Sequence, residues 1–221
     1  MSFVIKIEGV KYTWDPTKST PDWPKPADEM RQVVIRLKKY NVEKIIDFGC
    51  GRARNAGLLA TNFSRVYLVE VQKNMSLVKA WMQKYNYPQC TAFEWEVFKK
   101  AKIRADACLL SCVLHTLPNS NLRKQIISTI RSKLTNRGLV AFITPAHDSK
   151  YREKHLKDSK VEGDGVVRLF SDKTFSFYKN YEWEEFLEFI NEVGLRMCEK
   201  IPGDHRYIAL ACPKAKEVVT G

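Results

Sequence analysis

The stretch from Lys44 to Ala60 reads KIIDFGCGRARNAGLLA and is the most informative part of the chain. Its first residues, Ile45 to Phe48, form a short apolar run that is long enough for a buried parallel strand. Gly49 and Gly51 interrupt this run, and good helix formers follow. The order predicts a strand, a tight glycine turn and the start of a helix. At such a turn the backbone can approach a ligand closely, and unpaired N–H groups are available.

The rest of the chain continues this alternation of short apolar runs and amphipathic segments. The pattern predicts further strands at 65–72, 90–98, 104–111 and 139–144, helices at 27–40, 75–85, 121–134 and 182–193, and a terminal hairpin from 195–201 and 207–212. Strands that alternate with helices are typical of an α/β protein with a parallel sheet.

The ligand of the glycine turn is indicated by the residue at the sixth position of the loop. A nicotinamide or flavin fingerprint requires glycine there, and this chain has Arg54, which disfavours an oxidoreductase. The pattern Asp47-x-Gly49-x-Gly51-x-Ala53 instead resembles the first motif of the class I S-adenosylmethionine-dependent methyltransferases. Ala53 stands where the family usually has a third glycine. The continuation through Ala60 looks most like the tellurite-resistance-type and related small-molecule branches.

A second stretch resembles the same family. Residues 111–118 read SCVLHTLP, which is similar to the fourth motif, in which a strand end precedes Val-Leu-His and Leu-Pro. The resemblance extends over roughly residues 27–212. It implies a Rossmann-like, doubly wound α/β sheet of seven strands, mostly parallel, with a C-terminal antiparallel hairpin and helices on both faces. It also implies S-adenosylmethionine as cofactor and methyl transfer as the reaction.

The resemblance assigns cofactor contacts to residues near the ends of the predicted strands. Glu70 follows Gly51 by 19 residues, close to the spacing of about 20 expected for an acid that binds a ribose. Trp95 is placed for stacking on the adenine, or else packs under the next loop. The predicted cofactor-binding residues are Asp47, Gly49, Cys50, Gly51, Asn55, Glu70, Val71, Glu94, Trp95 and Ser111.

Two histidines are candidates for acid–base catalysis. His115 lies in the second motif, and His147 precedes Asp148 after the predicted strand 139–144. The reference pKa of histidine, about 6.5, suits proton acceptance from a substrate. Either histidine could instead be a packing residue. A base is optional, because the acceptor can lose its proton before it is methylated.

The chain divides into an N-terminal leader and one main domain. Residues 1–26 form the leader, with a short strand expected within 3–7 and a loop with four prolines at 12–26. Trp14 and Trp23 in that loop either cover the cofactor or pack on the core. Residues 27–221 form the methyltransferase domain, with a substrate-side insertion at about 146–180.

The composition limits the partners. The chain has 221 residues and a net charge of +12, which favours contact with polyanions, so a nucleic acid of the tRNA type is an alternative to a small-molecule acceptor. A module that binds the cofactor without catalysis is a further alternative. The sequence does not determine the acceptor or the oligomeric state.

Cysteine usage and hydropathy indicate a protein of the cytoplasm. None of the six cysteines forms a Cys-x-x-Cys pair or a zinc-binding pattern, so we expect reduced thiols and no metal. No segment is long and apolar enough to predict a membrane span or a signal sequence.

Overall fold

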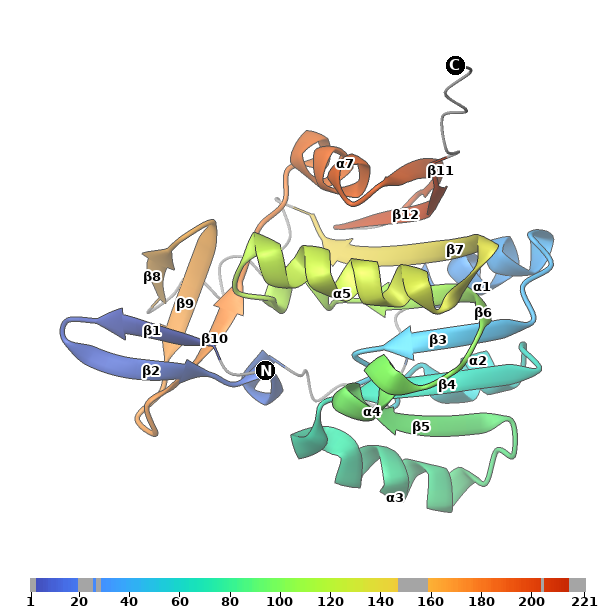
Figure 1. The fold of residues 1–221 in the computed structure, drawn as a ribbon, viewed down its shortest axis with the longest axis horizontal. Helices are drawn as coiled ribbons and strands as arrows, with labels where there is room; N and C mark the ends of the chain where they lie inside the picture. Colours follow the sequence, from blue (N-terminus) through green and yellow to red (C-terminus); the bar gives the residue numbers. More distant parts are fainter. Residues whose placement is uncertain (1–2, 20–25, 27–28, 147–158, 204, 215–221) are drawn as a thin grey trace.

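A seven-stranded sheet forms the centre of the computed structural model, which describes residues 3–19, 26, 29–146, 159–203 and 205–214. Its strands are β3 (Lys44–Phe48), β4 (Arg65–Glu70), β5 (Cys90–Glu94), β6 (Ala105–Ser111), β7 (Leu134–Pro145), β11 (Leu195–Ile201) and β12 (Arg206–Pro213). Their order is β11-β12-β7-β6-β3-β4-β5 (Figure 1). The strands β5, β4, β3, β6 and β7 are parallel to their neighbours, whereas β12 and β11 are antiparallel. This arrangement confirms the predicted fold class.

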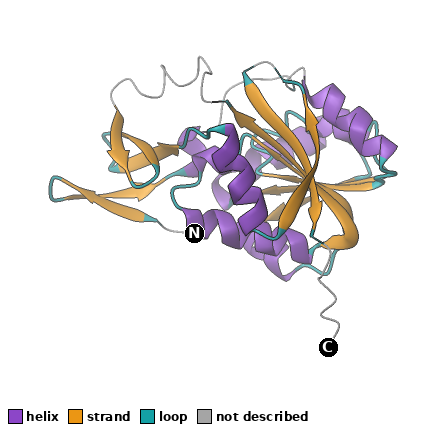
Figure 2. Cartoon of the chain, turned by 90° about the horizontal axis from the view of Figure 1, so that it is seen from above, coloured by secondary structure: helices purple, strands orange, loops and turns teal. Residues whose placement is uncertain are grey.

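Helices cover both faces of this sheet (Figure 2). They are α1 (Glu29–Lys39), α2 (Ala56–Ala60), α3 (Met75–Tyr85), α4 (Trp95–Lys100), α5 (Ser120–Ser132) and α7 (Trp183–Glu192). Side chains of α1, α2 and α3 share one buried cluster with Ile45 and Leu68, and those of α4, α5 and α7 share the other with Ile46 and Val69. Adjacent strand residues therefore point into opposite layers, as the two-residue period of a strand requires.

Two predicted boundaries are wrong. The strand expected at 90–98 ends at Glu94, because Trp95 and Phe98 are buried from one side of a short helix. The last parallel strand begins at Leu134 rather than Leu139, and it pairs with β6 from Ala105 onward through a register shift. Tertiary pairing thus extends β7 over residues that precede the predicted strand.

The leader and the insertion together build a second sheet, called the accessory sheet below. It consists of β1 (Val4–Ile7), β2 (Val10–Trp14), β8 (Ser159–Glu162), β9 (Gly165–Leu169) and β10 (Thr174–Tyr178) in the order β1-β2-β10-β9-β8. The two segments meet where β2 runs parallel to β10, with Phe175 opposite Trp14. Residues 12–14, predicted as loop, are therefore strand. In Figure 1 this sheet lies at one end of the molecule, beside the large sheet.

A buried charge network fastens the accessory sheet to the large sheet's helices. Arg123 of α5 is 2% exposed; its guanidinium donates to the Leu117 carbonyl at 2.7 Å and pairs with Asp164. Lys179, also buried, lies 3.4 Å from the same Asp164 carboxylate and 2.5 Å from Glu185 of α7. Removing one member of this network leaves a buried charge without its partner, which lowers the free energy of unfolding.

Cys198 and Cys212 form a disulfide across the β11–β12 hairpin. This differs from the expectation of six reduced thiols, because the sequence spacing gave no reason to pair any two of them. The free thiols of Cys50, Cys90 and Cys108 are buried. Among the described residues, no helix has the length and apolar character needed to cross a membrane.

Replacing Arg123 tests the buried network. We expect Arg123→Met to lower the free energy of unfolding by about 2–4 kcal/mol, since it leaves the Leu117 carbonyl and Lys179–Asp164 without the guanidinium. Urea denaturation measures the loss. The neighbouring Lys124→Met removes only an exposed pair with Glu192 and should change stability by less than about 0.5 kcal/mol. Equal losses in the two variants would contradict this role for Arg123.

Candidate functional site

A cavity opens at the carboxyl ends of β3, β4 and β6. It is lined by Trp14, Pro16, Ser19, Phe48, Gly49, Cys50, Gly51, Arg52, Arg54, Asn55, Val69, Glu70, Val71, Trp95, Ser111, Cys112, Val113, Thr116, Leu117 and Ile126. Open α/β sheets bind ligands at this edge, where the strand order reverses on either side of β3. The cavity is therefore the site at which the glycine turn can meet a ligand.

The turn after β3 depends on left-handed backbone conformations. Gly49 has φ +68° and Gly51 has φ +58°. A Cβ atom at Gly49 would lie only 2.6 Å from a methyl carbon of Val113, so a side chain is excluded there by space as well as by conformation. Ala53 also adopts a left-handed conformation, with φ +59°.

Glu70 joins the end of β4 to this turn. Its Oε2 accepts a hydrogen bond from the Gly51 N–H at 2.5 Å, and its Oε1 accepts one from the Val71 N–H at 2.8 Å. The residue is 8% exposed, and burial raises the pKa of the carboxyl although these hydrogen bonds oppose the shift. The Asn74 side chain also donates to this carboxylate, which has about four acceptor positions in all, so it keeps capacity for a further donor from the cavity.

Asp47 lies behind the turn and does not line the cavity. It is 1% exposed, and neither carboxylate oxygen has a hydrogen-bond partner of normal geometry among the described residues. Burial raises its pKa to about 7, against the opposing effects of the Arg54 charge and the Asn55 amide, and the negative charge of Glu70 adds to the increase. The folded chain therefore binds a proton at this carboxyl more readily than an exposed aspartate does.

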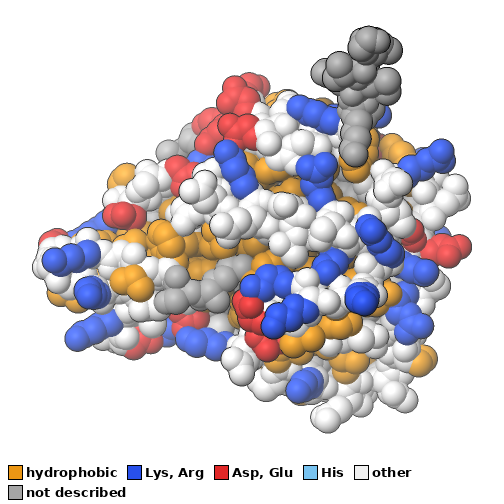
Figure 3. Space-filling model, in the orientation of Figure 1, with side chains coloured by type: hydrophobic (Ala, Val, Ile, Leu, Met, Phe, Trp, Pro, Cys, Tyr) orange, Lys and Arg blue, Asp and Glu red, His pale blue; other side chains and the backbone are white. Residues whose placement is uncertain are grey.

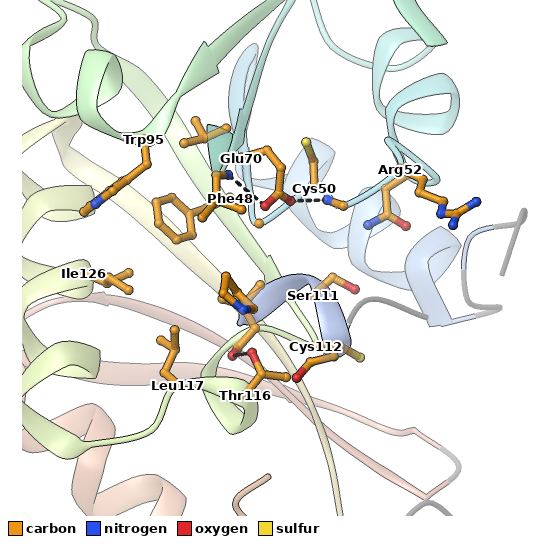
Figure 4. Close-up of a pocket in the computed structure, with 18 of the residues that line it drawn as sticks. Phe48, Cys50, Arg52, Glu70, Trp95, Ser111, Cys112, Thr116, Leu117 and Ile126 are labelled. Carbon is orange, nitrogen blue, oxygen red and sulfur yellow. Dashed lines mark hydrogen bonds between the residues drawn. The ribbon is translucent and has the colours of Figure 1, made fainter. Parts of the chain in front are cut away.

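The cavity changes from polar to apolar along its length (Figure 4). Arg52 lies at the glycine-turn end, Glu70 in the middle, and Trp95, Leu117 and Ile126 at the other end. Ser111, with Cys112 and Thr116, lies across from Glu70. The Ser111 hydroxyl and the Trp95 indole N–H are buried and have no hydrogen-bond partner among the described residues. Buried donors of this kind favour a ligand that supplies their acceptors.

Most of the predicted cofactor residues come together here. Gly49, Cys50, Gly51, Asn55, Glu70, Val71, Trp95 and Ser111 line the cavity. Asp47 and Glu94 do not. Glu94 is next to Glu70 in the register of β4 and β5, so it lies at the same sheet edge. A direct contact from either residue to the cofactor stays a prediction.

The two predicted catalytic histidines are not among the residues that line the cavity. The His115 ring packs edge-on against Tyr178 of the accessory sheet, with ring centroids 5.1 Å apart, and its carbonyl accepts from the Lys179 N–H at 2.7 Å. His147, with Asp148, lies outside the described residues. Acid–base roles for His115 and His147 stay predictions.

The sequence missed several lining residues. Pro16 and Ser19 come from the leader, and Phe48, Leu117 and Ile126 form the apolar end. For the last three, the only sequence signal was that of ordinary core positions. Trp14, which the sequence places either over the cofactor or on the core, lines the cavity from the end of β2.

The chain matches a family model described as a methyltransferase domain over residues 46–142. This segment holds the glycine turn, Glu70 and the end of β6. Residues 46–142 therefore match the methyltransferase domain model. No curated protein sequence shows significant similarity to it. The resemblance to methyltransferases is thereby confirmed, whereas the comparison with the tellurite-resistance branch stays a prediction.

Solved methyltransferases share the fold. An S-adenosylmethionine-dependent methyltransferase from Clostridium acetobutylicum is 12% identical, with a TM-score of 0.64 over 84% of this chain and 91% of that one. A 1,6-didemethyltoxoflavin-N1-methyltransferase from Burkholderia thailandensis, solved with S-adenosylhomocysteine, is 14% identical, with a TM-score of 0.61 over 85% of this chain and 79% of that one. An amino pentose methyltransferase from Micromonospora echinaspora, solved with S-adenosylmethionine, is 13% identical, with a TM-score of 0.59 over 85% and 91%. At these identities the likeness establishes the fold.

The polarity of the cavity fits S-adenosylmethionine, the cofactor that the resemblance implies. The cofactor has a charged amino acid at one end, a ribose diol in the middle and a nucleobase at the other end. The cavity offers the glycine turn with Arg52, then Glu70, then Trp95 with apolar neighbours, in the same order. No cluster of three or more His, Cys, Asp or Glu able to hold a metal ion occurs within the described part of the chain.

The raised pKa of Asp47 predicts a pH dependence of stability. In the unfolded chain its pKa returns to about 3.9, so the folded state holds the proton more tightly. The stabilisation of the folded state that the raised pKa of Asp47 provides is complete below about pH 4, and it is lost as the pH rises to about 7. We expect the free energy of unfolding of the wild type to fall relative to Asp47→Asn across that window, as measured by urea denaturation.

Asp172→Asn is the control. Hydrogen bonds from Thr174 and Lys18 lower the pKa of the Asp172 carboxyl to about 2, so its contribution is lost only as the pH falls below about 4. The difference in the free energy of unfolding between Asp172→Asn and the wild type should not change between pH 4 and 7. A flat difference for Asp47→Asn as well would show that Asp47 ionises normally in the fold.

Proposed function

We propose that this protein transfers the methyl group of S-adenosylmethionine to a small-molecule acceptor. The proposal rests chiefly on Glu70, which the Gly51 N–H fixes at the cavity with free acceptor capacity. A carboxylate in that position can accept from a ribose hydroxyl. The glycine turn beside it can take the methionine end, with Asn55 and the backbone of Gly49 to Gly51 as the contacts.

The nucleobase end is proposed to lie between Val71 and Trp95. The indole supplies an aromatic wall and one buried N–H that can donate to a ring nitrogen of adenine. Leu117 and Ile126 close the apolar end. Each part of the cofactor then meets a group of matching polarity.

The reaction requires alignment more than proton transfer. Bound S-adenosylmethionine supplies a methyl group already activated by its sulfonium charge. Ser111, Cys112 and Thr116, at the end of β6, line the wall across from Glu70 and would position the acceptor there. Trp14 and Pro16 would exclude water from the same space.

The cover over the cavity favours a small acceptor over a nucleic acid. Residues of the leader line the cavity directly, so an acceptor has to fit beneath the chain's own segments. On the face that Figure 3 shows, Lys and Arg side chains are scattered among uncharged ones rather than collected in one stripe. Two proteins that share the fold are a 1,6-didemethyltoxoflavin-N1-methyltransferase and an amino pentose methyltransferase, and the acceptors in these names are small molecules. We propose the accessory sheet as the substrate-side cover.

Glu70→Gln tests the ribose contact. The amide loses the charge and directs an NH2 group at the N–H donors of Gly51 or Val71, so we expect the Kd of S-adenosylhomocysteine to rise about 10- to 100-fold. Isothermal titration calorimetry measures this. Glu96→Gln, which changes an exposed pair with Lys99, should leave the Kd unchanged. Unchanged affinity in Glu70→Gln would refute the site assignment.

The fate of the methyl label tests the acceptor class. The protein is incubated with methyl-labelled S-adenosylmethionine and an extract of the organism that encodes it, and the extract is then separated by ultrafiltration. We expect label in the small-molecule filtrate, dependent on intact Glu70. Label retained with nuclease-sensitive material would instead support a nucleic-acid acceptor. Cofactor binding without any transfer would support a module that does not catalyse the reaction.

A further inference from the structure

An ion pair links the N-terminal segment that lines the cavity to the chain just after β4. Residues 14–19, called the strap below, run from the end of β2 through the 3₁₀ helix η1 (Pro16–Ser19). Trp14, Pro16 and Ser19 of the strap line the cavity. The strap meets the cofactor domain through Asp15, whose Oδ2 accepts from Lys73 Nζ at 2.9 Å.

Lys73 and Asp15 lie where the end of β4, the strap and the accessory sheet meet. Lys73 lies in the 3₁₀ helix η2 (Gln72–Asn74), three residues after Glu70, the proposed ribose ligand. Asp15 is 6% exposed, and its other oxygen accepts from the Thr17 N–H at 3.0 Å and the Thr17 hydroxyl at 2.7 Å. Its own N–H donates to the Phe175 carbonyl of β10 at 2.9 Å. Asp15 therefore connects the accessory sheet, the strap and the end of β4.

The charge of Asp15 is maintained by these contacts. Burial alone would raise the pKa of the carboxyl, but the hydrogen bonds from Lys73 and Thr17 outweigh burial and hold the pKa below its ordinary value. These contacts therefore favour the charged form of the Asp15 carboxylate. By contrast, Lys18 of the same strap pairs with Asp172 in the turn between β9 and β10, within the accessory sheet itself.

We propose that Asp15 and Lys73 are positioning residues that fasten the strap to the ribose-binding strand end, so that Trp14 forms a wall of the cofactor cavity. This inference rests on the proposed function of that cavity. Binding of the cofactor at Glu70 and docking of the strap then favour one another, because the cofactor and the strap both contact the same short segment, residues 70–73. A released strap has to be ordered when the cofactor binds, which weakens affinity.

The buried indole of Trp14 agrees with this arrangement. Its N–H has no hydrogen-bond partner among the described residues, although the side chain is 6% exposed and lines the cavity. A donor left in that condition costs free energy unless a ligand accepts from it. The strap therefore brings both an aromatic surface and an unused donor to the ligand.

The test compares three lysine variants of the full chain by calorimetry with S-adenosylhomocysteine. We expect Lys73→Met to raise the Kd about fivefold or more, and Lys73→Arg, which keeps the charge, to restore it to within about twofold of wild type. Lys18→Met removes an ion pair of the same strap without touching the end of β4, and it should leave the Kd within about twofold of wild type. Equal Kd values for Lys73→Met and Lys18→Met would overturn the proposal.

Amide hydrogen exchange supplies a readout that a loss of general stability would not mimic. In the wild type, S-adenosylhomocysteine should slow exchange at the strap and at residues 49–55. In Lys73→Met at saturating ligand, residues 49–55 should still be slowed while the strap is not. Slowing at both segments in that variant would overturn the proposal. Failure of the wild type to bind the ligand would refute the proposed function instead.

Discussion

The hydrogen bond from the Gly51 N–H to the Glu70 carboxylate is the contact on which the site depends. It joins two neighbouring parallel strands at the points where each ends, and so fixes the glycine turn relative to the acid that follows β4. The turn can come this close only because Gly49 and Gly51 adopt left-handed conformations and Gly49 packs against Val113 of the β6 end. One contact therefore places three strand ends around a single cavity.

The electrostatics of the site follow from the same geometry. Asp47 and Glu70 are both buried at adjacent strand ends, and burial raises the pKa of both carboxyl groups. The negative charge of Glu70 raises the pKa of Asp47 further. Glu70 receives two backbone N–H donors, whereas Asp47 has no hydrogen-bond partner of normal geometry among the described residues. The two carboxyl groups consequently differ in character, although both stand at the end of an apolar run in the sequence. The hydrogen-bonded one faces the cavity, and the other supports the turn from behind.

The accessory sheet extends the methyltransferase domain with segments from both halves of the chain. Its central pairing joins β2 to β10, so the leader cannot be placed without the insertion. The buried Arg123 and Lys179, paired with the exposed Asp164, anchor the insertion to α5 and α7, and Asp15 anchors the leader to the end of β4. The cover is thus attached to the cofactor domain by charged contacts at two places, while its apolar side chains join the main core.

The sequence by itself determined the alternation of strands and helices, the glycine turn and the acid 19 residues beyond it, because these depend on local periodicity and on conformations that particular residues favour. It also carried the two motifs from which the family was inferred. Only the tertiary structure decided that Trp95 begins a helix, that Asp47 lies behind the cavity, and that His115 packs against Tyr178. The accessory sheet was hidden for the same reason. Its strands are four or five residues long, and the pairing that joins its two halves, β2 with β10, connects residues about 160 positions apart. No local sequence pattern can predict such a pairing.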